Sequence, residues 1–357
     1  MNSILRVGVI GLGGAGLTHM KAFSKHPNTE VISIAGKEVE RLSQIATKFG
    51  VKNTAFDWQD LVADTELDII SIATPNVLHY PITMAALESG KHVFCEKPLA
   101  ITSKQTSEMF EVAKRNNCIL EVALNYRRRE DIIFGKELVS SGKLGRVYHS
   151  RASWKRRSGI PGIGSWFTSL EMAGGGAGID LGPHLIDSLL YMLGEPKVAT
   201  VSAVKHGELG MAGLGAMQLH GQMKGTGEFE VEDLCSALLR FEDGSSCQLE
   251  ITWASHSKDS DDISFELLGV QSGLRISIAN YASVNTLTIY EEIDGAPLTY
   301  SPEITSTTEG HLMVIQEFID HVTQGQQDNH TILNVIHRAT VLEAIYKSAK
   351  SGQEVKL

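Results

Sequence analysis

One histidine and two carboxylates stand four and three residues apart in the second half of the chain: Asp180, His184 and Asp187. Pro183 fits the first position of a helix that runs to about Leu193. His184 then lies in the first turn, where the helix dipole disfavours a protonated imidazole, and a neutral imidazole can act as a general base. Asp180 could orient the histidine or bind a substrate hydroxyl. Two other interpretations stay open. The three residues could ligate a metal, although no matching cysteine or second histidine stands nearby in the sequence, or they could form a structural turn.

A lysine held by a proline is the second group that could do chemistry. Glu96, Lys97 and Pro98 follow a short apolar strand. An ammonium group at that strand end can hold a substrate oxygen close to a nicotinamide and stabilise a developing alkoxide. The competing interpretation is a solvated surface lysine paired with Glu96. Ligands of open parallel sheets bind at the carboxyl ends of strands, so the same edge includes the residues after the preceding strand, Thr74, Pro75, Asn76 and His79.

The first strand of the chain runs directly into a glycine-rich turn. Its residues are Gly11, Leu12, Gly13, Gly14, Ala15 and Gly16. In the G-x-G-x-x-G spacing the first glycine allows a tight turn, the second lets the backbone approach a pyrophosphate, and the third lets the helix pack on the strand. Such turns also occur for conformational reasons alone. Here a strand precedes the turn and a helical pattern follows it, which favours binding of a dinucleotide at the helix N-terminus.

The elements that must position these residues fall into two patterns. Residues 5–124 alternate apolar strands with helices, which predicts an α/β domain with an open, doubly wound parallel sheet. Residues 125–357 contain few helices before the C-terminus, and an Asp-Gly hairpin signal at 243–244 favours an α+β domain on a largely antiparallel sheet. The strands predicted there are 147–155, 198–204, 234–241, 247–254 and 263–268. Residues 206–227 are rich in glycine and methionine and are predicted to form an exposed loop or lid.

Composition and charge exclude several classes of protein. The 32 basic and 42 acidic residues give a formal net charge of -10, which argues against nucleic acid or an anionic membrane as a partner. No apolar run approaches the roughly 20 residues of a membrane span, and the first strand begins too early to leave room for a signal peptide. The cysteines form no C-x-x-C pair. We therefore expect free thiols in a reducing cytoplasm, and they are Cys95, Cys118, Cys235 and Cys247.

Taken together, these motifs resemble the Gfo/Idh/MocA oxidoreductases, a family named after glucose–fructose oxidoreductase and inositol dehydrogenase. The glycine turn, the Ala73–His79 stretch and the Gly90–Ala100 stretch follow one another at the family's spacing. Asn125-Tyr126-Arg127 and the Gly174–Asp187 segment are similar to its later motifs. The resemblance implies a Rossmann domain over residues 1–124 and a substrate-binding and oligomerisation domain over 125–357.

The resemblance also implies roles for the candidate residues. Lys97 is then the catalytic lysine, with Asp180 and His184 as its partners. His184 takes the hydroxyl proton while a hydride moves to C4 of the nicotinamide, and Lys97 positions the oxygen. Residues of the glycine turn and of both strand ends bind the cofactor, Glu96 among them, and Asn125 lines the nicotinamide. Tyr126 and Arg127 line the substrate, and no metal is expected.

The cofactor is predicted from the end of the second strand, where this chain differs from many relatives. Many relatives carry an acidic residue there that binds the adenosine ribose, but this chain has Gly36, followed by Lys37 and Arg41. Without a carboxylate, a 2′-phosphate meets no repulsion, and the two cations could supply its counter-charge. The sequence therefore favours NADP over NAD. The alternative is a solvated helix face, with Glu38 left for the ribose.

The segment 153–167 is expected to cover the site from the second domain. Trp154 or Trp166 could stack on a sugar ring, and Arg156 or Arg157 could meet a hydroxyl or carboxylate. Tryptophans are more often packing residues, and basic runs are more often solvated. Of these we expect Arg157 and Trp166 to bind the substrate.

The function predicted is an NAD(P)-dependent dehydrogenase or reductase acting on a secondary alcohol or ketone of a sugar, sugar derivative or cyclitol. A non-catalytic dinucleotide sensor or co-regulator of the same fold is the alternative. A third possibility is hydrolytic or lyase chemistry in which a tightly bound cofactor carries the hydride only transiently. By analogy with the family, a homodimer or homotetramer is expected through the exposed face of the second-domain sheet.

Overall fold

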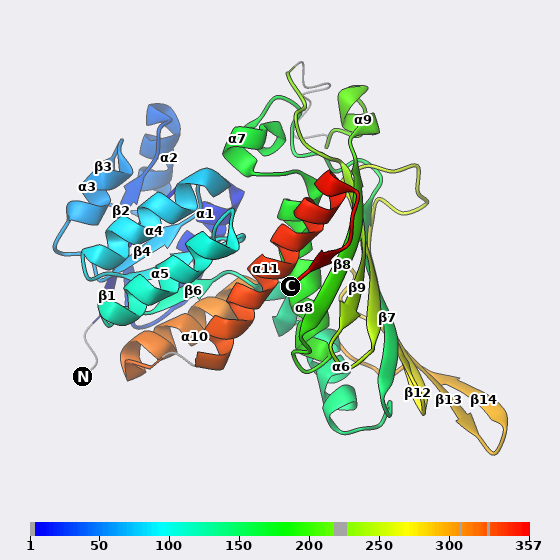
Figure 1. Cartoon of the computed structure of the whole chain (residues 1–357). Helices are drawn as coiled ribbons and strands as arrows, with labels where there is room; N and C mark the ends of the chain where they lie inside the picture. The colour runs from blue at the N-terminus through cyan, green and yellow to red at the C-terminus, as the bar shows by residue number, and fades with distance from the viewer. Residues whose placement is uncertain (1–3, 218–226, 307–308, 327–328) are drawn as a thin grey trace. The chain divides into compact units, whose positions relative to one another are not determined.

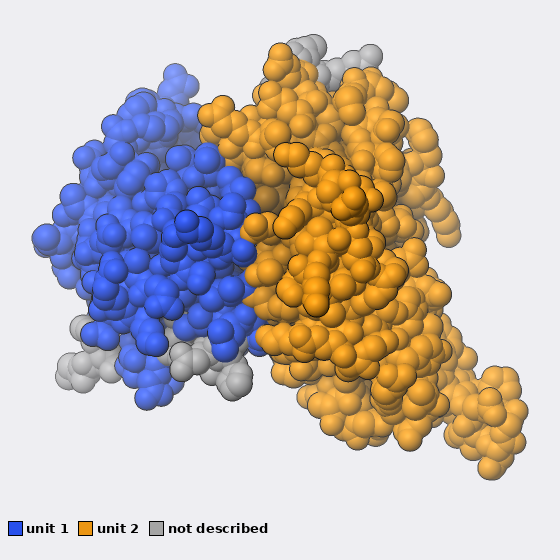
Figure 2. Space-filling view, viewed as in Figure 1, with its two compact units in different colours: residues 1–125, 309–336 blue, residues 126–308, 337–357 orange. Residues whose placement is uncertain are grey.

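The structure is a computed structural model that describes every residue except 1–3, 218–226, 307–308 and 327–328. The chain divides into two compact units (Figure 2). Unit 1 comprises residues 1–125 and 309–336, and unit 2 comprises residues 126–308 and 337–357. Among the described residues, no helix combines the length and apolar character that a bilayer crossing needs.

Unit 1 contains a six-stranded parallel sheet in the order β3-β2-β1-β4-β5-β6 (Figure 1). Its strands are β1 (Leu5–Ile10), β2 (Thr29–Ala35), β3 (Asn53–Ala55), β4 (Ile69–Ile72), β5 (His92–Cys95) and β6 (Leu120–Val122). The order reverses at β1 and β4, which is the switch point where open α/β sheets bind ligands. The predicted doubly wound sheet is confirmed, with β3 as an additional short edge strand.

Helices cover both faces of this sheet. They are α1 (Gly14–Lys25), α2 (Val39–Phe49), α3 (Trp58–Ala63), α4 (His79–Glu88), α5 (Ser103–Arg115) and α10 (Gly310–Gln324), with a 3₁₀ turn η1 (Asn76–Leu78). One apolar cluster joins β4 to α3, α4 and α5, and another joins β1 to α1, α2 and α10. The sequence-based division at residue 124 placed α10 in the second domain. It packs in unit 1 instead, because Phe318 buries its ring against Phe23 and Phe94.

Unit 2 is built on a nine-stranded sheet in the order β14-β13-β12-β11-β7-β10-β9-β8-β15. Among the named strands of the described chain, β7 and β10 pair in parallel and the other neighbours pair antiparallel, so the sheet is largely antiparallel as predicted. The strands are β7 (Val147–Arg156), β8 (Val198–His206), β9 (Leu234–Phe241), β10 (Ser246–Thr252), β11 (Asp261–Gly269), β12 (Ser272–Ala279), β13 (Leu287–Ile293), β14 (Ala296–Tyr300) and β15 (Val355–Lys356). The predicted hairpin at residues 243–244 joins β9 to β10.

Helices pack on one face of this sheet. The helices of unit 2 are α6 (Glu130–Ser140), α7 (Leu170–Ala173), α8 (Ala177–Met192), α9 (Glu208–Met211) and, from residue 337 on, α11 (Asn329–Ser351), with 3₁₀ turns η2 (Asn125–Arg128) and η3 (Trp166–Thr168). Leu185, Ile186 and Leu189 of α8 are buried in one apolar cluster with strand residues of β7, β9 and β10. The predicted lid at 206–227 begins with the end of β8 and α9, and its residues 218–226 lie outside the described part of the chain.

The start of α8 corrects one prediction. Pro183 was expected at the first helical position, but α8 begins at Ala177 and contains Pro183 in its interior. The earlier start is possible because Glu232 supplies acceptors for the first turn: its carbonyl accepts from Ala177 N and its carboxylate from Gly176 N and Gly178 N. Asp180, not His184, therefore lies in the first turn, and the dipole argument for a neutral His184 does not apply.

Candidate active site

The glycine turn of unit 1 has the geometry that a diphosphate requires. At Gly11, φ is +93° and a Cβ atom would lie 2.3 Å from the carbonyl oxygen of Ala73. A Cβ at Gly16 would lie 1.9 Å from the Gly11 carbonyl oxygen, so the helix can approach the strand only with glycine there. Cβ atoms at Gly13 and Gly14 would meet nothing within 4 Å. The N-terminus of α1 therefore faces open space, where its N–H groups can bind an anion.

Two side chains near the strand ends carry polar atoms that the described residues leave unsatisfied. Thr74 Oγ1 and Asn125 Oδ1 are buried without a hydrogen-bond partner in the described part of the chain. Buried polar atoms normally have a partner, so both atoms fit a site that a polar ligand completes. They belong to residues predicted from the sequence to bind the cofactor.

His79 lies inside this edge of unit 1. Its Nδ1 is 2.7 Å from the carbonyl oxygen of Pro98 and its Nε2 is 2.9 Å from that of Thr74. Burial lowers the pKa of His79, although the two carbonyls oppose the change. The imidazole thus links the ends of β4 and β5. It can affect cofactor binding by holding Thr74 and Pro98 in place. Pro75 and Asn76 complete this turn, and Asn76 is buried at the start of η1.

The residues predicted to choose the cofactor follow β2. Arg41 Nε donates to the carbonyl oxygen of Leu12 at 2.8 Å, which places this cation beside the glycine turn. Lys37 forms an ion pair with Asp57, and its ammonium lies 4.3 Å from the centre of the Phe56 ring. The Lys37–Asp57 pair is exposed on both sides, so it is weak and can be exchanged for a stronger anion.

Glu96 sits at the centre of a buried hydrogen-bond network in unit 1. His19 Nε2 lies 3.1 Å and His311 Nε2 lies 3.2 Å from Glu96 Oε1, and the Lys97 N–H donates to Glu96 Oε2 at 3.1 Å. Ser71 Oγ contacts His19 Nδ1 at 2.9 Å, and Asn125 Nδ2 contacts His311 Nδ1 at 3.2 Å. All partners are satisfied when both imidazoles carry a proton on Nε2.

The network keeps Glu96 ionised beside the candidate catalytic lysine. Burial would raise the pKa of the Glu96 carboxyl, but His19 and His311 together hold it well below its usual range. The three ligand-type atoms lie within 4.8 Å of one another, a spacing that a metal ion could also span. The sequence analysis missed both histidines, since they are 77 and 215 residues from Glu96 in the chain.

Asp180 and His184 are one helical turn apart on α8 in unit 2. Trp253 Nε1 donates to Asp180 Oδ2 at 2.8 Å, which fixes the carboxylate. His184 is buried, with ring centres 5.0 Å from Tyr126 and 5.9 Å from Trp154. The structure therefore brings the predicted substrate residue Tyr126 to the candidate base. Trp253 was not predicted, because only folding brings it near Asp180.

A second buried glutamate, Glu232, anchors the start of α8. Its Oε1 accepts from Gly176 N at 2.9 Å, from Gly178 N at 3.0 Å and from Tyr346 OH at 2.6 Å. A Cβ atom at Gly176 would lie 1.9 Å from the Glu232 carbonyl oxygen. The glycines of this segment thus serve close packing around a carboxylate that belongs to the protein.

The other predicted substrate residues differ in their surroundings. Arg127 forms a buried ion pair with Asp187, which Arg338 also contacts. Burial raises the pKa of the Asp187 carboxyl, but Arg127 and Arg338 outweigh this and lower it. Trp166 stacks on Phe167 with ring centres 3.8 Å apart and stays partly exposed, and the Arg157 side chain is exposed.

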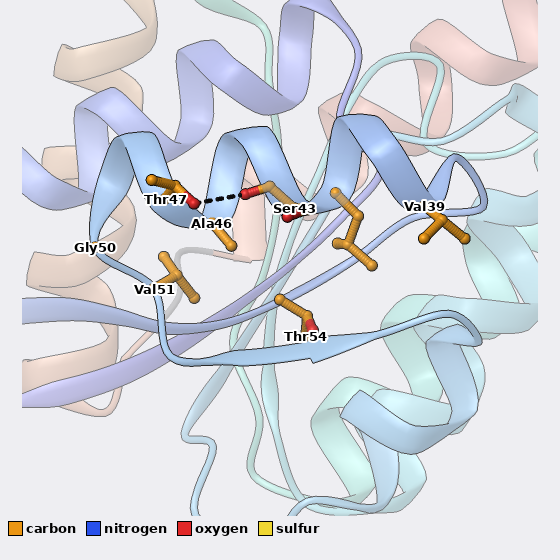
Figure 3. Close-up of a pocket in the computed structure, with 8 residues that line it drawn as sticks. Val39, Ser43, Ala46, Thr47, Gly50, Val51 and Thr54 are labelled. Carbon is orange, nitrogen blue, oxygen red and sulfur yellow. Dashed lines mark hydrogen bonds between the residues drawn. The ribbon is translucent and has the colours of Figure 1, made fainter.

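A separate groove lies between α2 and β3 in unit 1 (Figure 3). Its lining holds aliphatic and hydroxyl side chains with no charged group: Val39, Leu42, Ser43, Ala46, Thr47, Gly50, Val51 and Thr54. The Thr47 hydroxyl already donates to the Ser43 carbonyl at 3.0 Å. The groove offers neither a proton-transfer group nor a cation for an anion, so the active site is not placed there.

Two stretches of the chain match models of known protein families. Residues 5–124 match the model of an oxidoreductase family with an NAD-binding Rossmann fold. Residues 135–275 match the model of the Gfo/Idh/MocA C-terminal domain. The two matches cover the glycine turn, Lys97, Asp180 and His184.

Individual relatives match over most of the chain. D-Glucoside 3-dehydrogenase of Escherichia coli (strain K12) is 29% identical, covering 100% of this chain and 98% of its own length. Levoglucosan dehydrogenase of Pseudarthrobacter phenanthrenivorans is 32% identical, covering 76% of this chain and 73% of its own. A solved structure of levoglucosan dehydrogenase in complex with NADH and levoglucosan has a TM-score of 0.84 at 26% identity and covers 99% of both chains.

Proposed function

The chain belongs to the Gfo/Idh/MocA oxidoreductase family, and from that premise we propose that it interconverts a secondary alcohol and a ketone on a sugar, sugar derivative or cyclitol. The relatives named above are dehydrogenases of a glucoside and of levoglucosan. The observation that carries the proposal is the open α1 N-terminus at Gly13 and Gly14, in a chain that also keeps Lys97, Asp180 and His184. When bound, the nicotinamide supplies or accepts the hydride at C4.

The chain's own residues then divide the remaining work. Lys97 holds the substrate oxygen and stabilises the negative charge that develops on it. His184 accepts the hydroxyl proton in the oxidative direction and returns it in the reductive one. Asp180, fixed by the Trp253 indole, orients His184 or binds a neighbouring hydroxyl. Tyr126, Arg127, Arg157 and Trp166 are proposed to border the substrate.

For the cofactor we propose NADP over NAD. Support comes from the missing carboxylate at Gly36 and from two cations, Arg41 beside Leu12 and Lys37 on an exposed and weak ion pair. We expect NADPH to bind at least roughly tenfold more tightly than NADH, since a 2′-phosphate gains charge-assisted hydrogen bonds. The Gly36→Asp variant should reverse the order, because its carboxylate repels the phosphate.

Fluorescence titration with both reduced cofactors measures this preference. Gly36→Ala is the matched control. Both variants place a Cβ atom 3.0 Å from Leu12 Cδ1, but only the aspartate adds a charge. A wild-type preference for NADH would overturn the NADP proposal.

The function is tested with a panel of sugars and inositols, offered with each cofactor and followed by absorbance of the reduced nicotinamide. Lys97→Ala should lower kcat by about 100- to 1,000-fold, the typical cost of losing one oxyanion-stabilising donor, and leave cofactor binding nearly intact. Lys104→Ala on α5 is the control, because that lysine is exposed on the surface. Turnover retained in Lys97→Ala would remove Lys97 from the mechanism.

The same panel separates the alternatives. A sensor or co-regulator would bind the cofactor and show no turnover of any sugar. Hydrolytic or lyase chemistry would consume substrate without net change in nicotinamide absorbance. Retention of all three candidate catalytic residues favours the enzyme over the sensor.

We further propose that the chain works in a reducing compartment, the cytoplasm, as a homodimer or homotetramer. All four cysteines are free and buried, which supports such a compartment. Tyr148 of β7 and Val204 of β8 are exposed, and association would cover apolar surface of this kind. Light scattering after size-exclusion chromatography tests the assembly, and a monomer would contradict it.

A further inference from the structure

A clasp around Arg156 lies next to the candidate base in unit 2. Arg156 ends β7 on the same face as Trp154, two residues earlier, and its guanidinium carbon lies 5.2 Å from the centre of the Trp154 ring. Trp154 in turn packs against both Tyr126 and His184. Arg156 is therefore one aromatic ring away from the imidazole proposed to take the substrate proton.

Two partners hold the guanidinium in place. Asp261 stands opposite Arg156 in the β7–β11 ladder, and its Oδ2 accepts from Arg156 Nε at 2.8 Å. Its other oxygen accepts from Trp154 Nε1 at 2.8 Å, so one buried carboxylate orients both side chains. Arg156 Nη2 donates to Tyr281 OH at 2.8 Å. Among the described residues no hydrogen bond is made by Arg156 Nη1, which leaves that donor for a ligand oxygen.

The second partner comes from an unusual stretch of backbone. Asn280 and Tyr281 follow β12 with φ of 51° and 60°, the left-handed region that a bulky side chain rarely adopts. Asn280 exchanges hydrogen bonds with the Asp261 backbone, its N–H with the carbonyl and its side-chain oxygen with the N–H. Strained backbone of this kind persists where the surrounding structure enforces it and is frequent at ligand sites. Here the strain places the Tyr281 hydroxyl on Arg156.

The guanidinium of this clasp is already paired with a carboxylate of the protein. Burial lowers the pKa of Arg156, but Tyr281, Asp180 and Asp261 outweigh it and raise the pKa, so the guanidinium stays charged. Burial also raises the pKa of the Tyr281 hydroxyl to about 12, so it stays protonated near neutral pH. The Arg156 cation is thus paired with Asp261 at 2.8 Å and also feels the charge of Asp180. A further carboxylate brought here by a substrate would meet net negative charge.

We propose that the clasp of Arg156, Asp261 and Tyr281 selects neutral sugars over uronic acids: Arg156 donates to a hydroxyl oxygen, and the Asp261 carboxylate repels a substrate carboxylate. This inference rests on the proposed function, because Asp180 and His184 define the site beside the clasp. It adds to that function the class of substrate. Arg156 does not take part in the hydride or proton transfer.

Calorimetric titration with methyl β-D-glucopyranoside and its C6 carboxylate, the methyl glucuronide, tests the proposal on the full chain with saturating reduced cofactor. The wild type should bind the glucoside at least about tenfold more tightly. Asp261→Asn should narrow that difference by roughly tenfold, since it removes one negative charge within a few ångströms of the bound sugar. Arg156→Lys keeps the charge but loses the planar donor fork, and it should weaken glucoside binding about tenfold.

The controls separate selection from folding. Asp68→Asn removes the aspartate of a partly exposed Arg–Asp pair in unit 1 and should change neither affinity. Tyr281→Phe deletes a single hydroxyl and guards against misfolding of Asp261→Asn; it should weaken glucoside binding about threefold, whereas exposed Tyr300→Phe should not.

Equal affinity of the wild type for both sugars, absence of binding of either, or a preference unaltered in Asp261→Asn and Arg156→Lys would overturn the assignment of Arg156. A preference in binding without turnover of any sugar would instead sink the proposed hydride transfer and leave this inference in place. Turnover of sugars without the preference would overturn this inference and leave the proposed hydride transfer in place.

Discussion

Glu96 and Glu232 are both buried carboxylates, and each accepts hydrogen bonds that hold a segment with a candidate catalytic residue. Around Glu96 in unit 1 the donors are His19, His311 and the Lys97 N–H. Around Glu232 in unit 2 they are two backbone N–H groups of the α8 start and the Tyr346 hydroxyl. The first network consists mostly of side chains, whereas the second belongs largely to the backbone.

This difference predicts which network serves folding and which serves chemistry. Backbone N–H groups cannot titrate, and burial together with Glu232 raises the pKa of Tyr346 well above its usual range. The Glu232 network therefore fixes the start of the helix that carries Asp180 and His184. The Glu96 network instead joins side chains of α1, β5 and α10 at the strand end that carries Lys97.

The largest expected effect is on the stability of unit 2. Glu232→Ala leaves two buried N–H groups without an acceptor and opens a cavity, and should lower the free energy of unfolding by about 3–5 kcal/mol. Glu232→Gln keeps one oxygen acceptor and should lose less. Urea unfolding followed by tryptophan fluorescence measures this, since three of the four tryptophans, Trp154, Trp166 and Trp253, lie in unit 2. Exposed Glu171→Ala is the control, and equal midpoints for Glu232→Ala and this control would break the comparison.

A smaller effect, on catalysis, is expected in unit 1. Glu96→Gln should lower kcat/KM about 10- to 100-fold, as expected for loss of hydrogen bonds to a charged group worth roughly 1.5–3 kcal/mol. Its free energy of unfolding should change less than that of Glu232→Gln. His311→Gln should move kcat/KM in the same direction by less, because His19 remains.

Cofactor affinity is measured in the same Glu96 and His311 variants, so that weakened binding is not mistaken for slower chemistry. Unchanged kcat/KM in Glu96→Gln, with a loss of stability equal to that of Glu232→Gln, would show that both carboxylates serve folding stability. A stoichiometric metal ion that survives dialysis and is lost in Glu96→Gln would replace the hydrogen-bond account with coordination.

The comparison also explains how far the sequence could predict the site. The glycine turn, the strand end at Lys97 and the alternation of strands and helices are local patterns, and they predicted the parallel sheet and its ligand edge. The partners of both glutamates are distant in sequence: Glu232 lies more than fifty residues after the start of α8. No local pattern reports such pairs, which is why the start of α8 and the roles of His19 and His311 were missed.

Missed strands have a related cause. The predicted strands of unit 2 alternate buried and more exposed residues. β14 is exposed throughout and β13 alternates only at its start, so most of this hairpin lacks the apolar alternation that marks a strand. β12 does alternate and was missed all the same. β3 has only three residues at the edge of its sheet. The place of α10 in unit 1 depends on Phe318 meeting rings that precede it by more than 200 residues.

The smallest expected effect is a difference in how the two units respond to acid. Burial, with Lys197 and Arg338, lowers the pKa of His337 in unit 2 to about 4, and its Nε2 accepts from Val198 N at 3.3 Å. The unfolded chain binds this proton near pH 6.5, so unit 2 loses stability as the pH falls from about 6.5 to 4. Glu96 behaves differently, because its depressed pKa keeps its contribution until the pH falls below the unfolded value of about 4.3.

Urea midpoints read by tryptophan fluorescence should therefore fall as the pH is lowered from 6.5 to 4. His337→Gln should reduce the free energy of unfolding lost over that range by roughly 1 kcal/mol, after allowance for solvent screening of this partly exposed group. Exposed His256→Gln is the matched control and should keep the wild-type slope. In the same range the Glu96→Gln variant should run parallel to the wild type, since Glu96 stays ionised throughout it. A slope that His337→Gln leaves intact and Glu96→Gln removes would mean that Glu96 in unit 1, not His337 in unit 2, governs the acid response.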